Sequence, residues 1–147
     1  MAMTFTYNDG GRKAAGYQGD TGVCVVRAVA IATEQPYQAV YDALTEVERS
    51  RPKSKHNKRG STTVRNGVQT RSKAFKDYMA ALGWRWTPTM HIGSGCTVHL
   101  ADGELPMGRI IVLVSRHMVA VIDSVIYDTH DPQRDGGRCV YGYWRKA

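Results

Sequence analysis

Cys24 is the side chain in this sequence best placed to act as a nucleophile. It stands in the first turn of a predicted buried helix, just after the glycine-containing loop QGDTGVC. The N-terminus of a helix carries partial positive charge, which lowers the pKa of a thiol and favours the nucleophilic thiolate. The alternative interpretation is that Cys24 is a small core residue, as most helical cysteines are.

His117 is the candidate base, because a predicted hairpin brings a carboxylate beside it. The segment HMVAVID begins with His117, and VIYDT follows after a turn of two residues, Asp123 and Ser124. Such a turn fixes the register of the two strands. That register pairs Ile122 with Val125, Val119 with Asp128, and His117 with His130. Opposed residues share a face, so Asp128 is a diagonal neighbour of His117 and can fix the tautomer of its imidazole.

Gln18 is the candidate oxyanion donor. It precedes Cys24 by six residues, on the loop that enters the predicted helix. A side-chain amide at this point, together with the backbone N–H of Cys24, can stabilise the oxyanion of a tetrahedral intermediate. Taken alone, Gln18 is typical of a solvated loop residue.

The order of these four residues resembles that of the papain-like cysteine peptidases, and the compact C39-like bacterial peptidases are nearest in size. The resemblance implies that Cys24 is the nucleophile, His117 the general base and acid, Asp128 the residue that orients His117, and Gln18 the oxyanion donor. It further implies a papain-like fold and a peptidase, isopeptidase or amidase acting on a protein or peptide through a thioester. It implies no cofactor and no metal.

The resemblance covers about a third of the chain, near residues 17–33 and 112–144. In this family the third role often belongs to an Asp-Pro pair, which Asp131 and Pro132 provide here. Strand parity directs Asp131 away from His117 unless a bulge intervenes, so Asp128 is preferred and Asp131 is the alternative. The segments AVIDSVIYDTHD and VYGYW also resemble small bacteriophage proteins.

The elements that must position these residues form an α+β pattern, with N-terminal helices packed on a C-terminal antiparallel sheet. A helix capped by Asp20 or Thr21 is predicted from about residue 22 to 33, and it is apolar nearly all round. Apolar spacing predicts further helices near residues 37–50 and 68–82. Short apolar or alternating runs predict strands at 84–89, 109–115, 117–123, 125–129 and 140–144. With 147 residues, the chain is expected to form a single domain.

The positive charge is concentrated in one segment. The formal net charge is +7, and residues 49–73 contain nine Lys or Arg and no Asp or Glu. Residues 52–67 are almost free of apolar side chains, so we expect a mobile basic loop there. This loop gives the alternative function, a non-catalytic phage or bacterial protein that binds an acidic host protein or nucleic acid. Stacking aromatics are absent between Tyr41 and Phe75, which disfavours nucleic acid.

The remaining cysteines and histidines give weaker patterns. Three cysteines exclude a disulfide-dense scaffold and favour a reducing compartment, so Cys96 and Cys139 are expected to be unpaired packing residues. His91, Cys96 and His99, with Cys139 or His130, would be a loose zinc set without paired ligand motifs, and we predict no metal.

Several observations bear on where the protein works. No apolar run approaches the roughly 18 to 20 residues needed to cross a bilayer. Residues 1–10 have neither a basic n-region nor an apolar h-region, so a signal peptide is not expected. These features favour a cytoplasmic protein, in the host cytoplasm if a phage encodes it.

Overall fold

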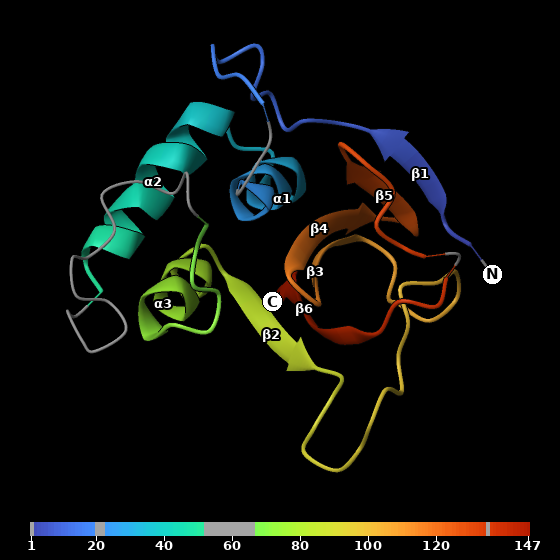
Figure 1. The fold of residues 1–147 in the computed structure, drawn as a ribbon. Coiled ribbons are helices and arrows are strands. Elements are labelled where there is room, and N and C mark those ends of the chain that lie inside the picture. The colour runs from blue at the N-terminus through green and yellow to red at the C-terminus, as the bar shows by residue number, and fades with distance from the viewer. Residues whose placement is uncertain (1, 20–22, 52–66, 135) are drawn as a thin grey trace.

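The fold is of the α+β class, with helices mostly N-terminal and strands mostly C-terminal (Figure 1). The structure, a computed structural model, describes residues 2–19, 23–51, 67–134 and 136–147. The helices are α1 (Cys24–Thr33), α2 (Tyr37–Arg49) and α3 (Lys73–Ala81). The strands are β1 (Thr4–Tyr7), β2 (Trp84–Pro88), β3 (Arg109–Val114), β4 (His117–Ile122), β5 (Val125–Asp128) and β6 (Val140–Lys146).

The predicted helices are present, but two of them start later than predicted. The N-cap of α1 is Val23, without a side-chain cap; the predicted caps Asp20 and Thr21 lie outside the described residues. Helix α3 begins at Lys73 rather than near residue 68, because the Ser72 hydroxyl accepts a hydrogen bond from the backbone N–H of Phe75 at 3.1 Å. A serine that satisfies a free N–H in this way favours a helix start at its own position.

The sheet is mixed rather than wholly antiparallel, so that part of the prediction was wrong. Its six strands lie in the order β1-β5-β4-β3-β6-β2. Strand β1 pairs in parallel with β5, with Thr4 opposite Val125 and Tyr7 opposite Asp128, whereas the other pairs are antiparallel. The segment TFTY of β1 is short and mostly exposed, as an edge strand often is, and so it carries little apolar signal in the sequence.

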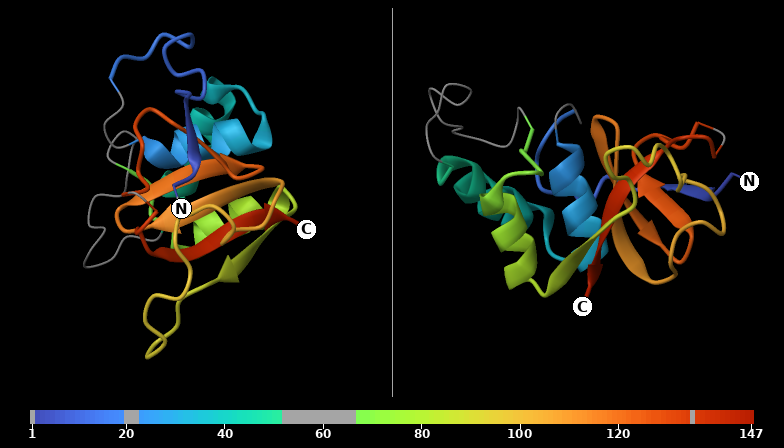
Figure 2. Two further views of the ribbon diagram at one scale, coloured as in Figure 1. Left: turned by 90° about the vertical axis from the view of Figure 1, so that its right-hand side faces the viewer. Right: turned by 90° about the horizontal axis from the view of Figure 1, so that it is seen from below.

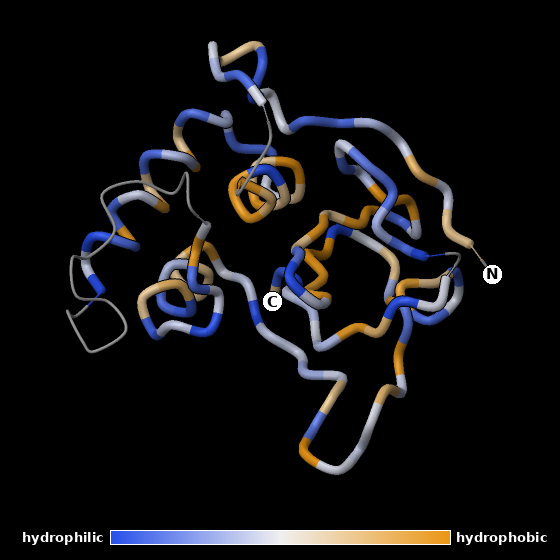
Figure 3. Tube along the Cα trace, in the orientation of Figure 1, coloured by the Kyte–Doolittle hydropathy of each residue, from blue (hydrophilic) through white to orange (hydrophobic). Residues whose placement is uncertain are grey.

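Apolar side chains pack on both faces of the sheet. One cluster joins the three helices to residues such as Met118 and Ala120 of β4. The other contains the alternate residues Val119 and Val121, covered in part by Leu100 from the long segment between β2 and β3. Figure 2 shows the helices gathered on one side of the sheet, and Figure 3 shows α1 as mostly apolar. Helix α1 is therefore held firmly against the strands.

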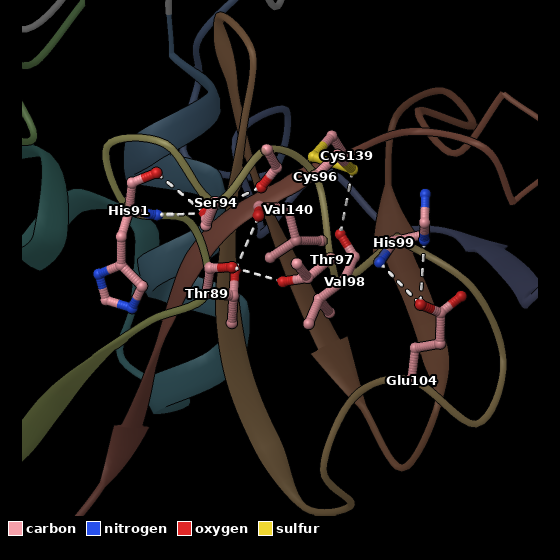
Figure 4. Close-up of a disulfide and its surroundings, with 11 residues drawn as sticks. Thr89, His91, Ser94, Cys96, Thr97, Val98, His99, Glu104, Cys139 and Val140 are labelled. Carbon is pink, nitrogen blue, oxygen red and sulfur yellow. Dashed lines mark hydrogen bonds and ion pairs between the residues drawn. A yellow bond between two sulfur atoms is a disulfide. The ribbon is translucent and has the colours of Figure 1, made fainter.

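Cys96 and Cys139 form a disulfide, which corrects the prediction that both are unpaired packing residues (Figure 4). An antiparallel bridge between His99 and Cys139 brings the two segments together, and the Cα atoms of the two cysteines are 5.8 Å apart. This separation is typical of disulfides. Whether these two cysteines form a disulfide depends on tertiary contact between segments 43 residues apart, and the number of cysteines alone does not indicate that contact.

Two other predictions concern the basic loop and membrane-spanning segments. The basic loop predicted at 52–67 lies outside the described residues, apart from Gly67. Within the described part of the chain, no helix has the length and apolar character needed to span a membrane.

Candidate active site

The β4–β5 hairpin has the predicted turn and register. Asp123 and Ser124 both have positive φ angles, 49° and 64°, as a two-residue hairpin turn of the I′ type requires. Ile122 lies opposite Val125 as predicted, and the ladder continues in that register to Ala120 and Tyr127. The predicted pairs Val119–Asp128 and His117–His130 lie beyond this ladder. The start of β4 and the end of β5 therefore lie at the same end of the sheet.

At that end of the sheet, His117 and Asp128 form a close pair. The His117 Nε2 and Asp128 Oδ2 atoms are 2.6 Å apart. Both side chains are largely buried, with 10% and 1% of their surface exposed. The backbone N–H of Thr129 also donates to Asp128 Oδ1 at 2.7 Å. Because Nε2 of His117 is occupied by Asp128, Nδ1 is the nitrogen left for a second partner.

Cys24, the first residue of α1, shares a side-chain hydrogen bond with His117, and α1 packs against β4. Burial raises the pKa of the Cys24 thiol. The hydrogen bond with His117, the His117 charge and the backbone N–H of Met118 together lower this pKa by more than burial raises it. The net result is a thiol pKa below its ordinary value. Cys24 is also the one free cysteine of the chain, since the other two form the disulfide.

The imidazole shifts in the complementary direction. Burial lowers the pKa of His117, but hydrogen bonds and charge interactions with Asp128 and Cys24 raise it to about 9. Burial likewise raises the pKa of Asp128, and His117 together with Arg27 brings it below the ordinary value. These shifts favour the charged forms of all three groups, a Cys24 thiolate beside a protonated His117 and an ionised Asp128.

Arg27 is a site residue that the sequence analysis missed. It lies on α1 one turn after Cys24, and its Nε and Nη2 atoms are 3.0 and 2.9 Å from Asp128 Oδ1. With only 3% of its side chain exposed, the guanidinium requires a buried carboxylate. The signal was available in the sequence, as a single arginine in the otherwise apolar helix VCVVRAVAIAT.

Gln18 and Asp131 do not join this group. The exposed Gln18 lines a separate hollow with Arg12 and Thr129, and its backbone carbonyl accepts a hydrogen bond from Arg12 Nη2 at 2.9 Å. Its role as oxyanion donor stays a prediction. The carboxylate of Asp131 accepts from the backbone N–H and side-chain amide of Gln133, at 3.1 and 2.9 Å. Asp128 therefore occupies the position beside His117, and Asp131 faces elsewhere.

A hollow of about 340 Å³ opens beside the Cys24–His117 pair. Its lining includes the apolar side chains of Val68 and Leu113. Substrate pockets commonly have a volume in this range and a largely apolar wall. The reacting atoms of the pair thus adjoin a space that a ligand can enter.

Three side chains that can ligate a metal lie near one another at this site. In the described residues, His117, Asp128 and His130 have ligand atoms within 4.8 Å of one another and could hold a metal ion. The His117 atom nearest to Asp128 is Nε2, so an ion held by these three residues would replace the hydrogen bond between His117 and Asp128. The zinc set weighed in the sequence loses its thiolate ligands, because Cys96 is bonded to Cys139, while His99 Nδ1 lies 3.0 Å from Glu104 Oε1.

Comparisons with known proteins give no relative from which a function could be carried over. No family model matches the chain, and no curated protein or solved structure matches it significantly.

Proposed function

We propose that the protein is a cysteine hydrolase of papain-like type, acting on an amide or isopeptide bond. The observation that carries the proposal is the row Cys24, His117 and Asp128 beside an open hollow, with a lowered thiol pKa and a His117 pKa of about 9. Helix α1 begins at Cys24 and packs against β4, which begins at His117. This arrangement supports the papain-like assignment.

The reaction has two halves. The Cys24 thiolate attacks the carbonyl carbon, and His117 gives its proton to the leaving amine as the C–N bond breaks, which leaves a thioester on Cys24. Water then attacks the thioester carbon and transfers a proton to His117 as the C–S bond breaks. The acid is released, and the thiolate and the protonated imidazole are restored.

The backbone of α1 offers donors for the oxyanion. As in any α-helix, the first N–H groups of α1, including that of Cys24, point toward its N-terminal end, and the N-cap Val23 has no side-chain acceptor for them. In the proposed mechanism the Cys24 N–H stabilises the oxyanion.

Alkylation by iodoacetamide tests the proposal, because Cys24 is the only free thiol. Between about pH 6 and 7, folded protein should react about tenfold or more faster than the same protein unfolded in urea, whose thiol is largely protonated. His117→Ala should remove the advantage, and Cys24→Ser should remove the reaction. Folded protein that reacts no faster than unfolded protein would contradict the proposal and favour the binding-protein alternative.

A further inference from the structure

The hollow at Cys24 continues into a second one. The second hollow, of about 470 Å³, lies beside Trp86 and Trp144. The two hollows share four lining residues, which are Thr70, Arg71, Leu113 and Tyr141. They therefore adjoin and make one groove, called here the Trp86 groove, that leads from the Cys24 thiol to the tryptophan pair.

The far end of the Trp86 groove is aromatic. The rings of Trp86 and Trp144 are 5.5 Å apart and tilted by 51°. Gly142, which lies opposite Pro88 on the paired strand, leaves room for the Trp86 ring, since a Cβ there would collide with that ring and with the Thr87 carbonyl oxygen. Pro88 and Met90 complete an apolar wall that suits a bulky apolar side chain.

The rim of the groove is cationic. Arg71 lines both hollows, Lys76 lines the far one and Arg116 lines the one at Cys24. Among the residues that the structure describes, no Asp or Glu lines either hollow. Arg71, Lys76 and Arg116 are exposed, and within the described part of the chain none of them forms an ion pair. Unpaired cations beside an apolar groove favour a ligand that carries carboxylates next to a large apolar side chain.

We infer that the Trp86 groove selects acidic peptide substrates, with a bulky apolar side chain against Trp86 and neighbouring carboxylates against Arg71 and Lys76. This inference rests on the proposed function, because it takes Cys24 as the reacting group. A peptide fits better than a nucleic acid, since the groove ends at a thiol and an imidazole, whose chemistry acts on acyl groups.

Electrophilic peptides that alkylate Cys24 test the inference. One probe carries Trp-Glu-Glu and its match carries Trp-Lys-Lys, and each is made both as an N-chloroacetyl peptide and as a C-terminal chloromethyl ketone. In both forms the thiolate attacks the CH₂ carbon and chloride leaves. The reactive group stands at the N-terminal end of one form and at the C-terminal end of the other. Because the groove extends from Cys24 in one direction, we expect only one form to place its peptide in the groove and to react at different rates with the glutamate and lysine sequences.

In that form, the glutamate probe should react about tenfold faster than the lysine probe, a ratio expected from two solvent-exposed ion pairs. Added salt should reduce the ratio. Arg71→Glu combined with Lys76→Glu should invert the ratio, whereas Arg85→Glu, an exposed charge reversal outside the groove, should leave it unchanged. Replacing Trp by Ala in the glutamate probe should slow its reaction by about tenfold, as expected for loss of a buried apolar contact.

Iodoacetamide separates the two ways of failing. Rapid iodoacetamide alkylation with no discrimination between the probes in either form would overturn the groove inference and leave the proposed hydrolase intact. Slow iodoacetamide alkylation would overturn the hydrolase itself. A thymidine oligonucleotide that slows the probe reaction more than an unreactive Trp-Glu-Glu peptide does would assign the groove to nucleic acid, and so would also overturn the inference.

Discussion

Replacing Arg27 by Met should destabilise the fold, because it removes the guanidinium that holds Asp128. The two side chains are 3% and 1% exposed, and breaking a buried ion pair of this kind costs about 3 to 5 kcal/mol. Two features reduce the cost. The carboxylate keeps His117 and the backbone N–H of Thr129, and the variant removes Arg27 Nη1, a buried atom that has no partner in the described part of the chain. We expect a net loss of about 2 to 4 kcal/mol.

Urea unfolding at pH 7 measures this loss, with the slope of the transition used to check that the unfolded state is unchanged. Arg109→Met is a matched control, since Arg109 also pairs with a carboxylate, that of Glu34, but the two side chains are 40% and 70% exposed. The control should cost less than about 1 kcal/mol. Equal effects of the two substitutions, or an Arg27→Met effect below about 1 kcal/mol, would refute the reasoning about the buried pair.

The same variant has a predicted pH dependence. The folded state lowers the pKa of Asp128 below 3.8, so the stability that its ionised form contributes is present above that value and is lost as pH falls through the lowered value. Without Arg27 the pKa of Asp128 rises toward its ordinary range. The difference between wild type and Arg27→Met should therefore shrink as the solution is acidified and the variant's carboxyl group becomes protonated.

Three further predictions concern the base, a buried carboxylate and the disulfide. Asp128→Asn should lower the pKa of His117 from about 9, because the carboxylate raises it, and NMR titration of the imidazole would show no downward shift if the assignment were wrong. Glu48→Gln should destabilise the protein by about 1 to 3 kcal/mol. The reason is that the buried carboxylate pairs with Arg51 at 2.7 Å and also accepts a hydrogen bond from the backbone N–H of Gln69 at 3.0 Å. An unchanged melting temperature in thermal unfolding would contradict this prediction. Reduction of the Cys96–Cys139 disulfide should lower the free energy of unfolding by up to about 4 kcal/mol, given the separation of 43 residues. The rate at which iodoacetamide alkylates Cys24 should stay the same. A large fall in that rate would contradict this prediction and show that the disulfide supports the site.

The sequence predicted the His117–Asp128 pair well because a two-residue turn leaves one register for the strands on either side of it. Asp123 and Ser124 specify that turn, and alternation of side chains along a strand then assigns the partners over the few residues that follow. The position of Cys24 at the start of α1 was predicted for a similar reason, since an apolar helix that follows a glycine-containing loop has a recognisable beginning.

The contacts that the sequence could not predict join distant segments. The parallel pairing of β1 with β5, the Arg27–Asp128 ion pair and the Cys96–Cys139 disulfide each depend on how separate elements pack. Local periodicity carries no information about such pairs. The placement of Gln18 is similar, because the Arg12 guanidinium, held by the Tyr37 hydroxyl at 2.7 Å, fixes the Gln18 backbone.

A pH titration of the Cys24 thiolate by its ultraviolet absorbance tests the central claim most directly, with Cys24→Ser as the blank. The proposed site predicts that Cys24 ionises at a pH below 9.0, its ordinary pKa, and that His117→Ala moves the transition upward, because the imidazole is the main group that offsets the effect of burial. A wild-type transition at 9.0 or higher, or one that His117→Ala leaves in place, would contradict the proposed thiolate–imidazolium pair.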